Sequence, residues 1–160
     1  MLKGEKRREQ ILAAAEEMFY QNGYERTTVS DIITALGLSK GGFYHHFESK
    51  EALLQAICDR KAEDSYAAAR RAVDDCPGSW ADKFNAMFDQ YGMWQSGNAD
   101  FMGLLIRVAY REDNLIMRDK LKRKSMGLML PLVEEIVKGG VAAQEFITPY
   151  PEGTGMLVLQ

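Results

Sequence analysis

The segment from Thr28 to Phe47 constrains the fold of this chain most tightly, because two short helices must follow each other within it. Thr28 followed by Asp31 has the form of a capping box, which marks the start of a helix. The residues after Thr28 then repeat at the i, i+3, i+4, i+7 spacing of one apolar helix face, at Val29, Ile32, Ile33 and Leu36. The sequence therefore predicts a short second helix that buries one side.

A tight turn and a third helix are predicted directly after it. Gly37 can take the left-handed conformation that a sharp interhelical turn requires, and Leu38 can fill the angle between the helices. Ser39 can cap a third helix, predicted over residues 40–47. Two short helices joined by about three residues centred on a glycine form the helix-turn-helix pattern.

The rest of the chain has the same helical character. Gly and Pro are sparse within long segments and cluster between them, so we predict an all-α chain with no strand. The other helices are predicted at residues 5–22, 50–73, 79–96, 100–110 and 113–138. In the helix at 50–73, the side chains expected to face inward are Leu53, Leu54, Ile57 and Cys58. Gly139 and Gly140 are expected to end the last of these, and Pro131 to kink it. A new helix starts at Pro151, yet the chain stops at Gln160, so C-terminal helices are expected to be missing.

Composition narrows the class of protein. With 46% hydrophobic and 27% charged residues among 160, the chain is expected to be globular with a true core. It has no apolar run long enough for a membrane span and no signal-peptide pattern, so we expect it in the cytoplasm. Cys58 and Cys76 lack the spacing of a zinc or disulfide motif and are expected to be reduced thiols. The net charge of −3 does not exclude a nucleic-acid partner, because phosphate is bound by a local surface.

The segment Ile11–Leu54 closely resembles the DNA-binding domain of the tetracycline-repressor (TetR) family. The resemblance lies in the ordered series ILAAAEEMF, NGYERTTVSDI, ALGLSKGGFYHHF and SKEALL. It implies an all-α homodimer in which the third helix enters the major groove of DNA. It also implies a helix-turn-helix domain over residues 1–48 and a helical effector-binding and dimerisation domain over 49–160, here truncated at the C-terminus.

The resemblance also implies which residues contact DNA. Carried over position by position, these are Thr28, Lys40, Gly41, Gly42, Tyr44, His45, His46 and Lys50. Phe43 and Phe47 fall on core positions of the family. The two glycines have no side chain to offer a base edge, but their backbone can approach DNA closely.

Elementary chemistry assigns these residues different tasks. Lys40, Lys50 and Tyr44 can donate to phosphates, as can the free N–H groups at the capped helix starts, and His45 can donate to or accept from a base edge. A basic arm could add phosphate contacts, from Lys3, Lys6, Arg7 and Arg8. Alternatives to these roles remain open. In the alternative, Thr28 serves only as a helix cap and Tyr44 is an aromatic residue at the edge of the core. For the basic run at residues 118–124, the two interpretations are a solvated helix face and a second DNA contact.

A Met-rich and aromatic second half is typical of an adaptable apolar pocket between helices. The candidate effector residues are Phe84, Phe88, Tyr91, Met102, Leu105, Arg107 and Met126. For each apolar residue the alternative is ordinary core packing. Arg107 is the candidate polar contact for an effector, with a structural salt bridge as its alternative.

Together these features predict a DNA-binding transcriptional regulator, a repressor that a small apolar or aromatic effector releases from a palindromic operator. The expected partners are double-stranded DNA, the effector and a second copy of the chain, with no membrane partner. No cofactor or metal is predicted, because His45 and His46 are adjacent and diverge on a helix. An enzyme is disfavoured, since the chain has no Glu-x-x-His pair, nucleophile elbow or Gly-rich phosphate loop. A helical module that only binds proteins would leave the helix-turn-helix pattern unexplained.

Overall fold

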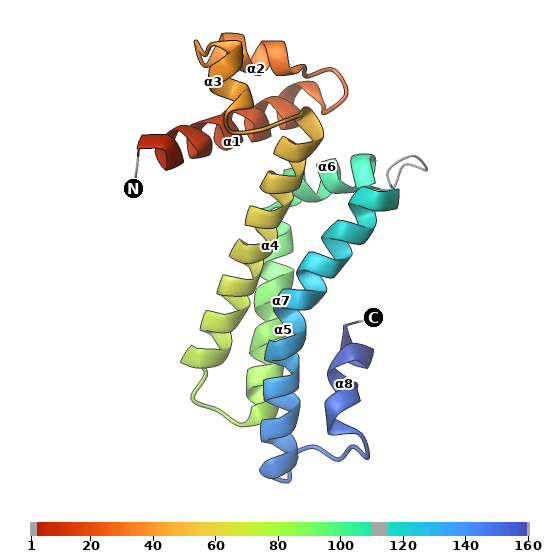
Figure 1. Ribbon diagram of the computed structural model, residues 1–160. Coiled ribbons are helices and arrows are strands. Elements are labelled where there is room, and N and C mark those ends of the chain that lie inside the picture. The colour runs from red at the N-terminus through yellow and green to blue at the C-terminus, as the bar shows by residue number, and fades with distance from the viewer. Residues whose placement is uncertain (1–2, 110–114, 160) are drawn as a thin grey trace. The chain divides into compact units, whose positions relative to one another are not determined.

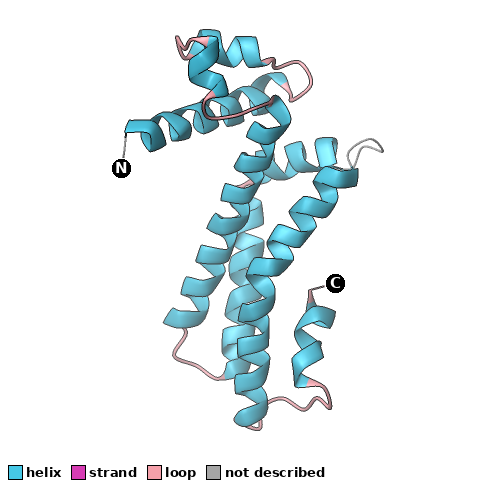
Figure 2. Ribbon diagram, in the orientation of Figure 1, coloured by secondary structure: helices cyan, strands magenta, loops and turns pink. Residues whose placement is uncertain are grey.

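The computed structural model describes residues 3–109 and 115–159. Within these ranges the chain is all-α, with eight helices and no strand (Figures 1 and 2). The helices are α1 (Lys3–Asn22), α2 (Val29–Ala35), α3 (Lys40–Tyr44), α4 (Lys50–Asp75), α5 (Trp80–Gly97), α6 (Ala99–Ala109), α7 (Leu115–Ala142) and α8 (Pro151–Val158). The predicted all-α fold class is confirmed. The predicted end of one helix at Tyr110 and the predicted start of the next at Asp113 lie outside the described residues.

The chain forms two compact units, and α4 contributes to both. The first unit comprises residues 1–60 and 100–118. Its buried side chains come from α1, α2, α3, the first half of α4 and α6, and include Ile11, Phe19, Ile32, Phe43, Leu53, Leu54, Ile57 and Leu104. The four residues of α4 that the sequence directs inward, Leu53, Leu54, Ile57 and Cys58, are all buried.

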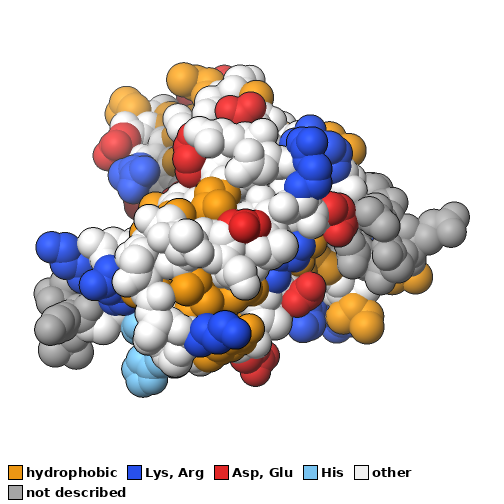
Figure 3. All heavy atoms as spheres, turned by 90° about the horizontal axis from the view of Figure 1, so that it is seen from above, with side chains coloured by type: hydrophobic (Ala, Val, Ile, Leu, Met, Phe, Trp, Pro, Cys, Tyr) orange, Lys and Arg blue, Asp and Glu red, His pale blue; other side chains and the backbone are white. Residues whose placement is uncertain are grey.

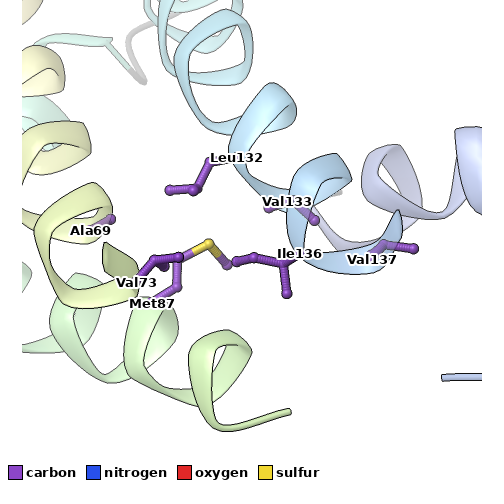
Figure 4. Close-up of a cluster of buried hydrophobic side chains, with 7 residues drawn as sticks. All are labelled: Ala69, Val73, Met87, Leu132, Val133, Ile136 and Val137. Atoms are coloured by element: carbon purple, nitrogen blue, oxygen red, sulfur yellow. The ribbon is translucent and has the colours of Figure 1, made fainter. Parts of the chain in front are cut away.

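The second unit comprises residues 61–99 and 119–160. Its core joins the second half of α4, α5 and α7 through Ala69, Val73, Met87, Leu132, Val133, Ile136 and Val137 (Figure 4). Phe146 after α7, and Val158 and Leu159 at the end of α8, pack against this cluster. The units are therefore each built around their own buried apolar residues.

The prediction that Gly139 and Gly140 end the long helix is wrong, because α7 continues to Ala142. A Cβ at Gly139 would collide with the Trp80 ring, and one at Gly140 with the Phe146 ring. These glycines serve close packing inside the helix rather than its termination. The helix ends instead where Gln144 adopts a left-handed backbone with φ 61°, and Phe146 N–H donates to the Gly140 carbonyl at 3.1 Å.

Other boundaries differ by a few residues. The third helix was expected to reach Phe47 but ends at Tyr44, with His45 as its C-cap, and the N–H of Phe47 still donates to the Phe43 carbonyl at 3.1 Å. The predicted starts at Pro151 and after Ser79 are confirmed. Pro131 lies inside α7, whose helix continues through it, and the kink stays a prediction. Among the described residues no helix has the length and apolar character needed to span a membrane.

The turn between α2 and α3 generates a stability prediction. Gly37 has φ +59°, and a Cβ there would meet no atom within 4 Å, so only backbone strain opposes a side chain. We expect Gly37→Ala to lower the free energy of unfolding by about 1 kcal/mol. Gly92→Ala is the matched control, because Gly92 lies inside α5 with equally open space, and this change should stabilise by up to about 1 kcal/mol. Urea denaturation measures both, and equal effects of the two variants would contradict the strain argument.

Candidate nucleic-acid interface

The start of α2 is a complete capping box. The Thr28 hydroxyl accepts from Asp31 N–H at 3.1 Å, and Thr28 N–H donates to the Asp31 carboxylate at 2.8 Å. The Thr28 hydroxyl also donates to the same carboxylate at 2.8 Å. Donation from the Thr28 backbone, then from its hydroxyl, lowers the pKa of the Asp31 carboxyl. Thr28 therefore has the capping role that the sequence left open, and it remains exposed at the surface.

The start of α3 is capped by Ser39, whose hydroxyl accepts from Gly42 N–H at 3.0 Å. A Cβ at Gly42 would lie 3.2 Å from this hydroxyl, so Gly42 lets the cap close. A Cβ at Gly41 would meet no protein atom within 4 Å. Glycine weakens a helix, so its presence at position 41 needs a reason. Packing within the protein does not supply that reason.

The rest of α3 separates a buried side from an exposed side. Phe43 is fully buried and Phe47 is nearly so, as the core assignment requires. Tyr44 is 53% exposed and its ring meets the Phe43 ring edge-on, with 5.4 Å between centroids. His45 is exposed and His46 is partly exposed. The side chains with hydrogen-bonding capacity thus face outward from a fixed apolar anchor.

Lys50 has a structural partner that the sequence did not reveal. Its Nζ donates to the Tyr24 carbonyl at 3.0 Å and lies 4.2 Å from the centroid of the Tyr24 ring. Tyr24 in turn packs edge-on against Phe19 of α1, with 5.1 Å between centroids. Lys50 therefore ties the first residue of α4 to the turn that follows α1. An ammonium group has three donors, so this bond leaves others for a phosphate.

Lys40 and the residues of the basic arm differ in their contacts with the rest of the protein. Lys40 is exposed at the first position of α3, and Lys6 and Arg7 are exposed on α1. Arg8 instead lies over the Phe47 ring at 5.1 Å and pairs with Glu9 at 3.6 Å. The Lys3 side chain lies outside the described part of the structure. In Figure 3 the Lys and Arg side chains lie among acidic and apolar ones and form no single basic patch on that face.

An ion-pair cluster joins α1 to α4 within the first unit. Arg60 pairs with Glu9 at 3.1 Å and with Glu16, whose carboxylate also accepts from the Tyr20 hydroxyl at 2.6 Å. Burial, then this hydrogen bond and the Glu16 charge, raise the pKa of Tyr20 above its usual value. Sequence reasoning missed this cluster because its members are up to 51 residues apart and no local pattern connects them.

A second buried hydroxyl that the sequence did not single out is Thr27. It donates to the Gly23 carbonyl at 2.9 Å and to the Met18 carbonyl at 3.2 Å, and its side chain is 1% exposed. The two adjacent threonines therefore have different roles, since Thr27 stabilises the turn after α1 and Thr28 caps α2.

The candidate effector residues divide between the two compact units. Phe84, Phe88, Tyr91 and Met126 belong to the second unit, and Met102, Leu105 and Arg107 belong to the first. Phe84 packs against the second core and lies 4.9 Å from Phe88, centroid to centroid. Arg107 is exposed, and no described residue forms an ion pair with it. Whether any of these residues contacts an effector stays a prediction.

The structure also bears on two other roles considered from the sequence, a metal site at the adjacent histidines and a DNA contact by the basic run. His45 and His46 have ring centroids 5.0 Å apart, and no group of three metal-binding side chains occurs among the described residues. In the basic run, Arg123 pairs with Asp119 at 2.7 Å and Lys124 with Glu63 at 2.6 Å. These two cations therefore have intramolecular partners on solvated helix faces.

Comparison with known proteins identifies relatives of the N-terminal region. Residues 11–57 match the family model described as "Bacterial regulatory proteins, tetR family". The HTH-type transcriptional regulator TtgR of Pseudomonas putida is 40% identical over 70 residues, 42% of this chain and 33% of that protein. The HTH-type transcriptional repressor Rv1474c of Mycobacterium tuberculosis is 40% identical over 65 residues, 41% of this chain and 35% of that protein. These alignments thus cover about a third of each relative.

The fold is similar over a greater length. The crystal structure of a transcriptional regulator of the TetR/AcrR family from Thermobifida fusca superimposes with a TM-score of 0.70. The alignment covers 96% of this chain and 80% of that chain at 24% sequence identity. The similarity shows that the helices after the N-terminal region share that fold.

The contact between Lys50 and Tyr24 generates a prediction about stability. We expect Lys50→Ala to lower the free energy of unfolding by about 1 kcal/mol, because it removes a charged hydrogen bond and a cation–π contact. Lys40→Ala is the matched control, since Lys40 is exposed and its loss should change stability by less than about 0.5 kcal/mol. Thermal and urea unfolding measure the difference, and a Lys50 variant as stable as the Lys40 variant would contradict the assignment.

Proposed function

Since this chain belongs to the tetR family of bacterial regulatory proteins, we propose that it is a DNA-binding transcriptional regulator whose α3 reads operator DNA. The observation that carries the proposal is that α3 has one buried apolar side and one exposed polar side. Phe43 anchors the helix in the core, while Lys40, Tyr44 and His45 face outward. A helix held in this way can present its polar side to the major groove without rearrangement.

Phosphate binding follows from donors placed around α3. Lys40 lies at its first turn, Tyr44 at its last, and Lys50 has donors beyond the one that holds Tyr24. Thr28 is exposed at the start of α2. Each phosphate that a donor neutralises releases a counterion, so a few such contacts suffice for salt-dependent affinity. His45 and His46 are the side chains proposed to meet base edges.

Gly41 supports close approach of the backbone to DNA. Its position is exposed and has room for a Cβ within the protein, so the partner rather than the fold accounts for the glycine. Gly42 has a different basis, because it borders the Ser39 cap.

We further propose that the working form is a cytoplasmic homodimer and a repressor. One helix of five residues contacts only a few base pairs, so two copies on a palindromic operator, about 34–36 Å apart, would supply the specificity. The relative Rv1474c is named a repressor, which favours repression over activation here. An effector that prefers the form with lower operator affinity would release the DNA. The apolar and aromatic residues of α5 and α7 favour an apolar or aromatic effector.

An enzyme or a purely protein-binding module is the alternative. Selection of bound duplexes from a random pool, followed by a gel shift with the selected sequence, separates these classes. A regulator yields a palindromic consensus, and retention of no duplex at low salt would refute the proposal.

Gly41→Ala tests the close approach of α3 to DNA. We expect this variant to be more stable by up to about 1 kcal/mol, because alanine favours helix and its Cβ meets no protein atom. We also expect operator affinity to fall at least tenfold, because the methyl group would separate α3 from the DNA. Unfolding and gel-shift measurements on one preparation test both parts, and unchanged affinity would show that DNA does not approach this backbone.

Lys40→Ala and His45→Ala separate phosphate contact from base reading. Loss of the Lys40 contact should weaken binding on all sequences and reduce the slope of log K against log salt by about one. Loss of His45 should change the selected consensus and leave that slope nearly unchanged. Lys138→Ala removes one exposed positive charge from the second unit and is the charge control. If Lys40→Ala alters the consensus without changing the slope, the two roles are wrong.

A further inference from the structure

Arg60 joins two carboxylates of α1 from one position on α4. Its guanidinium pairs with Glu9 at 3.1 Å through one terminal nitrogen and with Glu16 through the other. Glu9 and Glu16 are about two helical turns apart along α1. A single contact would let α1 swing about it, whereas two contacts to one planar guanidinium fix the direction in which α1 crosses α4.

Each carboxylate of this cluster also has a second partner. The Tyr20 hydroxyl donates to Glu16 Oε1 at 2.6 Å, while Arg60 donates to Oε2. Glu9 likewise pairs with Arg60 through Oε2 and with Arg8 through Oε1, the latter at 3.6 Å. Opposite charges therefore alternate along the cluster, and each ionic group restrains the orientation of the next.

The cluster reaches the segment that follows α3 through Arg8. The Arg8 guanidinium lies 5.1 Å from the centroid of the Phe47 ring. Phe47 N–H donates to the Phe43 carbonyl at 3.1 Å, and the two rings are 6.2 Å apart, centroid to centroid. A continuous set of contacts thus runs from Arg60 on α4 through Glu9 and Arg8 on α1 to the buried side of α3, all within the first unit.

Stability alone does not account for this cluster. The side chains of Arg8 and Glu9 are each 45% exposed, and that of Arg60 is 28% exposed. Ion pairs with this much exposure contribute little to the free energy of unfolding, because solvent screens them. Their hydrogen bonds are still directional, so their main effect is on how the helices are oriented.

We propose that Arg60 is a positioning residue for DNA binding, which sets α1 across α4 and, through Glu9 and Arg8, restrains α3 within the first unit. This role rests on the proposed function of α3 in reading operator DNA. Arg60 bonds to carboxylates, so it acts through these contacts and not on phosphate. A purely stabilising Arg60 would instead alter unfolding and leave the operator affinity of the folded protein unchanged.

Methionine variants at two arginines of α4 test this role on the whole 160-residue chain. Arg60→Met keeps an apolar stem and removes the guanidinium. Arg70→Met is the matched control, because Arg70 also bridges two carboxylates, those of Asp74 and Glu135, and its side chain is 30% exposed. Arg70 belongs to the second unit, so this control removes an equivalent contact from the other unit.

We expect both variants to melt within a few degrees of the original protein, because each loses only partly exposed ion pairs. Gel shifts with the selected duplex should show about tenfold weaker binding for Arg60→Met and less than about twofold change for Arg70→Met. The slope of log K against log salt should be the same in all three proteins, because no phosphate contact is removed. Arg60→Lys should bind with intermediate affinity, since an ammonium keeps the charge but lacks the fork that reaches both carboxylates.

Glu9→Gln separates positioning from simple electrostatics, because the two predict opposite signs. Removal of a negative charge from the DNA-binding unit would by itself strengthen binding to DNA. Since Glu9 links Arg60 to Arg8, we expect its loss to weaken binding. The double variant with Arg60→Met should bind no more weakly than Arg60→Met alone, because both changes break one link.

Amide hydrogen exchange gives a readout that needs no DNA. Without the link, the segment at the end of α3 is less restrained. The Phe47 N–H should therefore exchange about tenfold faster in Arg60→Met, and at the original rate in Arg70→Met.

Three results would each overturn the inference: equal operator affinities of Arg60→Met and Arg70→Met, a salt slope lowered by about one in Arg60→Met, or tighter binding by Glu9→Gln. DNA binding that does not depend on Arg60 refutes the positioning role alone. If the original protein binds no duplex, the proposed regulatory function is refuted, and the exchange of Phe47 N–H decides the inference. Exchange that depends on Arg60 then supports the restraint of α3, and exchange that does not depend on it refutes that restraint.

Discussion

The apolar face of α4 is the constraint on which both compact units depend. Its first half places Leu53, Leu54 and Ile57 in the core of the first unit, and its second half places Ala69 and Val73 in that of the second. Burial of large aliphatic side chains is the main favourable term in folding, so neither unit could lose this helix and keep its core. The face also includes Ser65, the one position in this stretch where a hydroxyl replaces an apolar group.

Polar contacts supply the geometry that apolar burial leaves undetermined. Two helix caps, at Thr28 and Ser39, define where α2 and α3 begin. Lys50 then attaches α4 to the turn after α1 through the Tyr24 carbonyl, and Arg60 attaches α4 to α1 itself through Glu9 and Glu16. Hydrogen bonds are directional, whereas hydrophobic burial is not, so these contacts orient the surface that α3 exposes.

The glycines of this chain illustrate how one residue type has several physical explanations. Gly37 is required by its backbone conformation, and Gly139 and Gly140 by rings that occupy the space of a Cβ. Gly41 has neither explanation within the protein. Departures from local stability rules that the fold does not explain are expected at functional sites, and this is the basis for proposing that Gly41 lies against DNA.

The sequence by itself determined the all-α class, the helix-turn-helix and the inward residues at the start of α4, because these follow from local periodicity, capping and turn chemistry. It also placed Phe43 in the core and the helix start at Pro151 correctly. The tertiary structure decided that α7 runs through Gly139 and Gly140, because Trp80 and Phe146 pack against them. It likewise decided that Lys50 bonds to Tyr24 and that the Ser65 hydroxyl has no partner among the described residues. These outcomes join residues far apart in the chain, and no local pattern encodes which distant groups meet once the cores have formed.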